Sequence, residues 1–141
     1  MPVTQFDHYT LRSLDVDVTA RFYADILGLR VESLDSFEFP FRLLFVGEHA
    51  AVHLIGAGPG LDAFLSRSAP SLRPNRARDA SNLEHVAFNG SGFRDMIRRL
   101  TEAGTPFIER TLADYGVVQL LFDDPDGVEI EVNFPLAELE A

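Results

Sequence analysis

The 141-residue sequence contains no cysteine. This absence excludes a disulfide scaffold and thiolate metal sites, so His, Asp and Glu remain as candidate metal ligands. Tryptophan is absent too, but twelve phenylalanines suit a packed α/β interior. A chain of this length buries about two thirds of its unfolded surface. We therefore expect one domain, residues 1–141.

Long apolar runs and an excess of positive charge are also missing. No run approaches the ~18 residues of a membrane span, and the N-terminal MPVTQFDHYTLR lacks the layout of a signal peptide. Twelve Lys and Arg stand against 22 Asp and Glu, and the net charge of −10 opposes attraction to nucleic acid or anionic lipid. We expect a cytoplasmic protein without nucleic-acid or membrane partners.

Two halves of the chain repeat one order of predicted elements. In residues 4–56, a strand (FDHYTL) and a helix (VTARFYADI) precede three short strands at 29–33, 42–46 and 50–55. Residues 83–134 again give a strand, a helix and three strands. The segment 57–82 between them is polar and rich in Gly and Pro, with one possible short helix, and reads as a linker. The pattern predicts two βαβββ modules.

The last predicted strand, in DPDGVEIEVNF, follows a turn formed by Pro125 and Gly127. Its apolar residues alternate with Glu129, Glu131 and Asn133, which therefore share one face. A buried carboxylate is tolerated only when it is paired, protonated or bound to a metal. This face is thus either solvated or functional.

Four polar residues occupy equivalent positions in the two halves of the predicted repeat. His8 and His85 are 77 residues apart and fall in the first strand of each half, whereas His53 and Glu131 are 78 apart and fall in the last. If the halves face each other about a pseudo-twofold axis, the four side chains converge. Imidazole and carboxylate bind Zn, Fe, Ni, Co or Mn. The alternative is that the histidines bond to backbone and that Glu131 is solvated, although unpartnered polar groups in AAVHLI and LEHVAF would cost ~1–3 kcal/mol each.

The segments FDHYTL, RFYADILGL, AVHLIG, LEHVAF and DPDGVEIEVNF resemble the vicinal oxygen chelate superfamily, which includes glyoxalase I, bleomycin-resistance proteins and extradiol dioxygenases. The resemblance implies an α+β fold in which two βαβββ modules form an open, U-shaped mixed sheet around a divalent metal ion. The metal-ligand positions of the family match His8, His53, His85 and Glu131. The resemblance also implies a homodimer and a small-molecule substrate.

Departures from individual relatives leave the reaction open among an isomerase, a lyase and a ring-cleaving dioxygenase. Glyoxalase I usually has Glu or Gln at the position of His53, so here only Glu131 could act as its carboxylate base. Extradiol dioxygenases hold iron at positions matching His8, His85 and Glu131, with an acid/base His near His53, yet Leu112 and Leu121 stand about where their further His and Tyr occur. The phosphonate loop of fosfomycin thiol transferases is not matched by TLADYGVVQLLF.

Two site hypotheses follow. In one, all four side chains bind the metal; in the other, three bind it and His53 is a general base, with an unperturbed pKa near ~6.5 that suits proton transfer. Glu131 is the other catalytic candidate. In either case the metal would act as a Lewis acid on adjacent substrate oxygens.

Four further residues are candidates for substrate binding or support of the site. These are Thr10, which has the strand parity of His8, Gln119, Glu129 and Tyr115. The rival function is that of a metal-free, ligand-sequestering protein of the bleomycin-resistance type. Because those relatives generally lack the ligand set, the full set here favours an enzyme.

Overall fold

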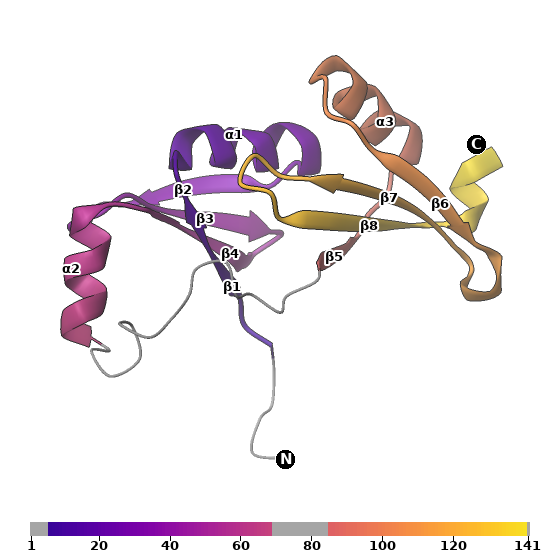
Figure 1. Cartoon of the computed structure of the whole chain (residues 1–141). Coiled ribbons are helices and arrows are strands. Elements are labelled where there is room, and N and C mark those ends of the chain that lie inside the picture. Colours follow the sequence, from indigo (N-terminus) through magenta and orange to yellow (C-terminus); the bar gives the residue numbers. More distant parts are fainter. Residues whose placement is uncertain (1–5, 69–84, 141) are drawn as a thin grey trace, which may run out of the picture. The chain divides into compact units, whose positions relative to one another are not determined.

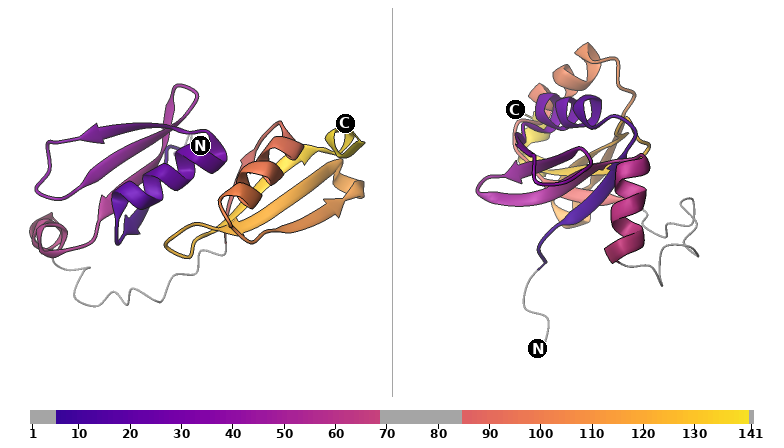
Figure 2. Two further views of the ribbon diagram at one scale, coloured as in Figure 1. Left: turned by 90° about the horizontal axis from the view of Figure 1, so that it is seen from above. Right: turned by 90° about the vertical axis from the view of Figure 1, so that its left-hand side faces the viewer.

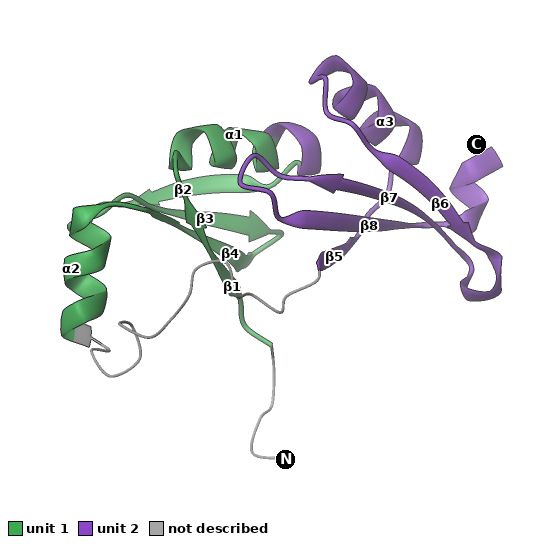
Figure 3. Cartoon of the chain, viewed as in Figure 1, with its two compact units in different colours: residues 1–24, 28–81 green, residues 25–27, 82–141 purple. Residues whose placement is uncertain are grey.

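The computed structural model describes residues 6–68 and 85–140 and divides the chain into two compact units (Figure 3). Unit 1 comprises residues 1–24 and 28–81, and unit 2 comprises residues 25–27 and 82–141. Each unit contains one four-stranded sheet. The predicted α+β class with two βαβββ modules is confirmed.

The first sheet has the strand order β1-β4-β3-β2, in which β1 runs parallel to β4 and the other neighbours are antiparallel (Figure 1). Its elements are β1 (Tyr9–Ser13), α1 (Val16–Leu27), β2 (Arg30–Leu34), β3 (Phe41–Val46), β4 (His49–Gly56) and α2 (Pro59–Ser68). β1 is therefore an edge strand next to β4, and β3 and β2 follow on the other side of β4. This arrangement places the N-terminal end of β1 beside the middle of β4.

Helix α1 begins and ends at sequence signals. The side chain of Asp15 accepts hydrogen bonds from the backbone N–H groups of Asp17 and Val18, and the helix ends at Gly28 with a φ of 72°. Tyr23 and Ile26 on its inner face are buried. Figure 2 shows the helix lying across one face of the first sheet. Burial of this apolar stripe is what joins the helix to the strands.

Helix α2 occupies the beginning of the segment 57–82 that the sequence analysis reads as a linker. It begins two residues before the possible helix LDAFLSR. A Cβ atom on Gly60 would lie 2.5 Å from the carbonyl oxygen of Glu38, so only glycine lets this first turn approach the loop between β2 and β3. The remaining linker, from residue 69 onward, lies outside the described residues.

The second sheet has the order β5-β8-β7-β6, with β5 parallel to β8 and antiparallel pairing elsewhere. Its elements are β5 (Val86–Asn89), α3 (Phe93–Glu102), β6 (Ile108–Leu112), the 3-10 turn η1 (Ala113–Tyr115), β7 (Val117–Asp123), β8 (Glu129–Pro135) and the 3-10 turn η2 (Leu136–Glu140). The topology repeats that of the first sheet strand for strand. The two four-stranded sheets therefore share one topology.

The first strand of each unit starts later than the sequence predicts. The β1–β4 ladder begins at the pair Tyr9↔Val52, and the β5–β8 ladder begins at Val86↔Ile130. His8 and His85 thus immediately precede their strands instead of lying within them. The two positions remain equivalent, because each histidine is one residue before the first pair of its ladder.

Helix α3 packs on its sheet and is held by the C-terminal turn. The rings of Phe93 and Phe134 meet edge to face at 5.4 Å. The N–H of Gly92 donates to Glu138 Oε1 at 2.9 Å, and Arg94 donates to the carbonyl oxygen of Leu139 at 2.7 Å.

Among the described helices, none is long and apolar enough to cross a membrane.

Candidate functional site

In unit 1, the imidazole rings of His8 and His53 lie face to face. Their centroids are 3.6 Å apart and their planes are inclined by 6°. His53 lies in β4, where its Cα partner across the parallel ladder is Thr10 of β1. Because alternate residues of a strand share a face, His8 and Thr10 are brought to the same side as His53. Both of the metal-ligand candidates in this unit are therefore adjacent.

Asp7 orients the ring of His8. The Nδ1 atom of His8 and Oδ2 of Asp7 are 2.5 Å apart, which matches a short charge-assisted hydrogen bond. This hydrogen bond from His8 lowers the pKa of the Asp7 carboxyl group. With Nδ1 engaged, Nε2 is the nitrogen of His8 available for a metal. The sequence analysis missed Asp7, whose only signal is its place directly before His8.

The surroundings of His53 favour its neutral form. Burial lowers the pKa of the ring below its usual value of 6.5, and the neighbouring charge of His8 lowers it further. A neutral imidazole has a lone pair to offer to a metal or to a proton. His53 is thus suited to either of the two roles considered for it.

In unit 2, His85 and Glu131 form the corresponding pair. In the β5–β8 ladder, Glu131 pairs with Ala87, which is two residues after His85. In the same way, His53 pairs with Thr10, which is two residues after His8. His85 Nε2 is 3.8 Å from Glu131 Oε1. The Nδ1 atom of His85 is 3.9 Å from Glu129 Oε2. Each histidine that precedes a first strand thus has an acidic residue beside Nδ1.

Glu131 is buried, with 10% of its side chain exposed, and a closed ring of hydrogen bonds holds it. Arg110 donates from Nε to Gln119 Oε1 at 2.6 Å and from Nη2 to Glu131 Oε1 at 3.4 Å. Gln119 donates to Asn133 Oδ1 at 2.8 Å, and Asn133 donates to Glu131 Oε2 at 3.2 Å. Both carboxylate oxygens are therefore partnered, as a buried carboxylate requires.

Arg110 and Asn133 were not among the site residues that the sequence predicted. The ladder pairs Arg110 with Gln119 and Gln119 with Asn133, so the three form one row across β6, β7 and β8. The alternation of β8 places Asn133 on the face of Glu131, which is a signal in the sequence. Arg110 joins that face only through the register of β6, which the sequence pattern does not fix.

The four residues predicted to bind substrate have different surroundings. Thr10 is exposed beside the histidine pair, and Glu129 is half-buried near His85. Gln119 is buried, and its amide group is engaged by Arg110 and Asn133. Tyr115, in η1, is 80% exposed.

The described residues place the metal-ligand candidates in two pairs. Over residues 6–68 and 85–140, no three His, Asp or Glu side chains lie close enough together to hold one ion. Unit 1 supplies His8 and His53, and unit 2 supplies His85 and Glu131.

Comparison with known proteins gives relatives over nearly the whole chain. "Glyoxylase I 4" of Arabidopsis thaliana is 25% identical over 133 residues, which cover 92% of this chain and 70% of that protein. A glyoxylase/bleomycin resistance protein/dioxygenase domain from Frankia sp. EAN1pec matches 94% of this chain and 98% of its own, with a TM-score of 0.66 and 20% identity. The structure of lactoylglutathione lyase from Agrobacterium tumefaciens matches 95% of this chain and 96% of its own, with a TM-score of 0.61 and 20% identity.

The structural likenesses establish the fold, and the sequence profile of one superfamily matches residues 5–132. That match spans both modules and includes His8, His53, His85 and Glu131. The chain belongs to the Glyoxalase/Bleomycin resistance protein/Dioxygenase superfamily.

Proposed function

We propose that the chain is a divalent-metal-dependent enzyme that acts on a small oxygen-bearing substrate. The reaction class is isomerase, lyase or ring-cleaving dioxygenase. The names of two relatives, a glyoxylase I and a lactoylglutathione lyase, agree with the lyase alternative. The enzyme is proposed to be cytoplasmic and homodimeric.

The observation that carries this proposal is the pair of equivalent donor sets. His8 with His53, and His85 with Glu131, occupy the same places in two topologically identical sheets. Surface histidines acquired by chance have no reason to follow the repeat. Imidazole and carboxylate are suitable ligands for Fe, Ni, Co, Zn or Mn. The proposal requires both pairs to act on one ion, within one chain or across two copies.

The stacking of His8 and His53 favours three ligands over four. A metal lies in the plane of the imidazole that binds it, about 2.1 Å from the nitrogen. The rings of His8 and His53 lie in nearly parallel planes with their centroids 3.6 Å apart, so their in-plane lone pairs do not converge on one point. The two rings cannot both bind one ion while they stack. We assign the ligand role to His8, His85 and Glu131.

Asp7 supports this assignment by fixing which nitrogen of His8 is free. Its carboxylate holds Nδ1–H, as outer carboxylates commonly do for metal-binding histidines. In unit 2, Glu129 lies beside Nδ1 of His85, and the hydrogen-bond ring orients Glu131. When bound, a divalent cation supplies Lewis acidity toward adjacent oxygens of the substrate. The chain's own residues then orient the ligands and move the proton.

His53 is the proposed general base. Its lowered pKa keeps a ring nitrogen unprotonated at neutral pH, so that this nitrogen can accept a proton from the substrate. His8 covers one face of the His53 ring and limits its rotation. Thr10, exposed and opposite His53 in the ladder, is the nearest proposed contact for a substrate hydroxyl or carbonyl group.

Metal analysis of protein purified without chelator tests the proposal. About one equivalent of a transition metal per chain supports it, with Fe favouring the dioxygenase and Ni, Co or Zn favouring the isomerase or lyase. A protein that takes up none of these metals, even when they are supplied in excess, would be a sequestering protein instead.

A further inference from the structure

Arg110 uses one edge of its guanidinium group to hold Gln119 and Glu131, and we propose that the other, terminal edge binds a carboxylate of the substrate. The inference rests on the proposed function and names the substrate class: a compound with adjacent oxygens for the metal and a carboxylate for Arg110. Arg110 would then determine specificity, in addition to holding Glu131.

The hydrogen bonds of Arg110 use only one edge of the planar guanidinium group. Nε donates to Gln119 and Nη2 donates to Glu131, and these two donors lie on the same edge. The terminal edge, formed by Nη1 and the second hydrogen of Nη2, has no partner within residues 6–68 and 85–140. Half of the side chain is exposed. Two parallel donors are thus left for a ligand on a half-exposed side chain.

The free edge is held in a fixed orientation. Gln119 is buried, and its amide group is fixed by a second bond to Asn133, so the bond to Nε cannot swing. Asn133 closes the ring by donating to the other oxygen of Glu131. A guanidinium fixed in this way loses little entropy when it binds a ligand.

The charges of the neighbourhood explain why the guanidinium would select a carboxylate. The whole chain carries a net charge of −10, and Glu129 and Glu131 lie on the same face of β8. Such a face repels anions unless a cation is fixed on it. Arg110 is paired with one carboxylate oxygen at 3.4 Å, which leaves most of its donors for another. The planar terminal edge matches the two oxygens of a carboxylate.

Two probes separate this role from the support of Glu131. Catechol and 3,4-dihydroxybenzoate both carry adjacent oxygens, but only the second has a carboxylate. We expect the metal-saturated protein to bind 3,4-dihydroxybenzoate more tightly than catechol in titration calorimetry. Arg110→Gln should weaken 3,4-dihydroxybenzoate by at least about tenfold more than it weakens catechol, because any loosening of Glu131 affects both probes, whereas loss of the charged hydrogen bonds to the carboxylate affects only the first.

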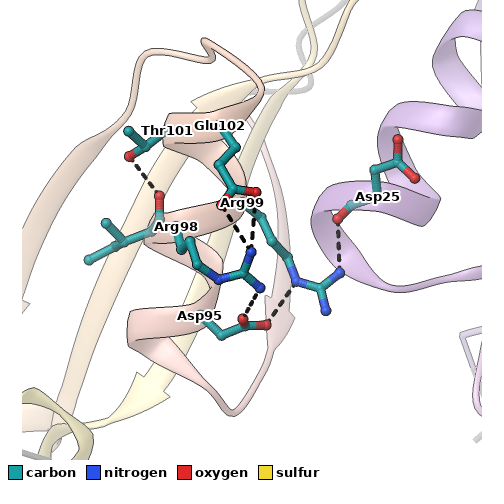
Figure 4. A network of polar contacts seen from close by, with 7 residues as sticks. Asp25, Asp95, Arg98, Arg99, Thr101 and Glu102 are labelled. Carbon is teal, nitrogen blue, oxygen red and sulfur yellow. Dashed lines mark hydrogen bonds and ion pairs between the residues drawn. The ribbon is translucent and has the colours of Figure 1, made fainter.

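Arg98→Gln is the matched control. Arg98 lies on α3, donates to Asp95 and Glu102 (Figure 4), and its replacement changes the net charge by the same amount. We expect this variant to bind both probes as the wild type does. Arg110→Lys keeps the charge without the planar pair of donors, so its affinity for 3,4-dihydroxybenzoate should lie between those of the wild type and Arg110→Gln.

Three results would overturn the inference: equal affinity of the wild type for both probes, an equal loss of both in Arg110→Gln, or the same loss in Arg98→Gln. A chain that binds no metal refutes the proposed function, not this inference. In that case the same comparison, made by NMR on protein treated with chelator, decides whether Arg110 distinguishes the two probes.

Discussion

His8 and His53 are stacked with their ring centroids 3.6 Å apart, although 45 residues separate them in the sequence. Face-to-face stacking places their in-plane lone pairs in parallel planes. One ring can therefore bind a cation while the other remains free to take a proton. This relationship links the residue just before β1 to β4, and in the proposed function it gives the two rings different chemical roles.

Replacing the histidines one at a time should separate these roles. His85→Ala removes a proposed ligand, and we expect the purified variant to lose its metal. His53→Ala should keep the metal and lose turnover, because it removes the proposed base and not a proposed ligand. Metal content per chain and metal affinity by calorimetry are the measurements.

His49→Gln serves as the control for these variants. His49 is exposed and contacts the backbone carbonyl of Asp7, and glutamine retains a donor for that contact. Its metal content should equal that of the wild type. If His53→Ala lost its metal, the result would support the four-ligand hypothesis, in which His8 and His53 must unstack to bind the ion.

Asp7→Asn tests the orientation of His8. Asparagine is neutral and cannot hold Nδ1–H as strongly, so the metal affinity should fall by about 10- to 100-fold. The thermal midpoint of the metal-free protein should hardly change, because Asp7 is exposed. Asp35→Asn, another exposed carboxylate in unit 1, provides the same change of charge. An affinity reduced equally in both variants would point to overall charge instead of orientation.

The lowered pKa of His53 predicts a pH dependence of stability. Between this lowered value and the usual 6.5, the unfolded chain binds more protons than the folded chain. The free energy of unfolding therefore rises with pH across that window; the contribution is complete above pH 6.5 and is lost as the pH falls. Urea unfolding at about pH 5.5 and about pH 7.5 should show this trend, and His53→Gln should reduce it.

NMR titration of metal-free protein follows the same group directly. The His53 ring signals should titrate below pH 6.5, and His8→Ala should move that midpoint upward, because it removes a neighbouring charge and part of the burial. A midpoint above 6.5 in the wild type would contradict the assignment of His53 as a neutral base.

Glu138→Ala should destabilise unit 2. Gly92, at the start of α3, has no side chain to cap the helix, and its N–H donates to Glu138 Oε1 instead. Loss of this acceptor and of its negative charge at the helix start should cost about 1 kcal/mol in urea unfolding. Glu138→Gln keeps an acceptor and should lose less. Glu140→Ala, an exposed neighbour, should leave stability unchanged.

Much of the fold could be predicted because the hydrophobic periodicity of the segments agrees with the glycines and prolines at their ends. The helix ending at Gly28 and the alternation of Ile130, Val132 and Phe134 follow directly from local rules, and all three of those β8 residues are buried. The first residues of β1 and β5 could not be predicted, because a strand begins where it first pairs with its neighbour, and the sequence does not give that register. The extent of α2 was missed because Pro59 and Gly60 also suit a turn.

The candidate site was predictable where it follows the repeat. The register confirms that His53 and Glu131 occupy equivalent ladder positions. The partners of these residues were harder to find. Arg110 reaches Glu131 across two neighbouring strands, and its place depends on pairing between segments that a single sequence does not align. The roles of Gln119 and Asn133 depend on the same row.

The two donor pairs differ in how far their supporting contacts reach along the chain. Asp7 is the immediate neighbour of His8, whereas Arg110 and Glu131 are 21 residues apart and meet only through β7. Closing that longer loop has an entropic cost that local pairing does not. During folding, the first histidine can acquire its orientation early, but the carboxylate acquires its own only after three strands have assembled. In the proposed function, cation binding would therefore follow assembly of the second sheet and would not nucleate it.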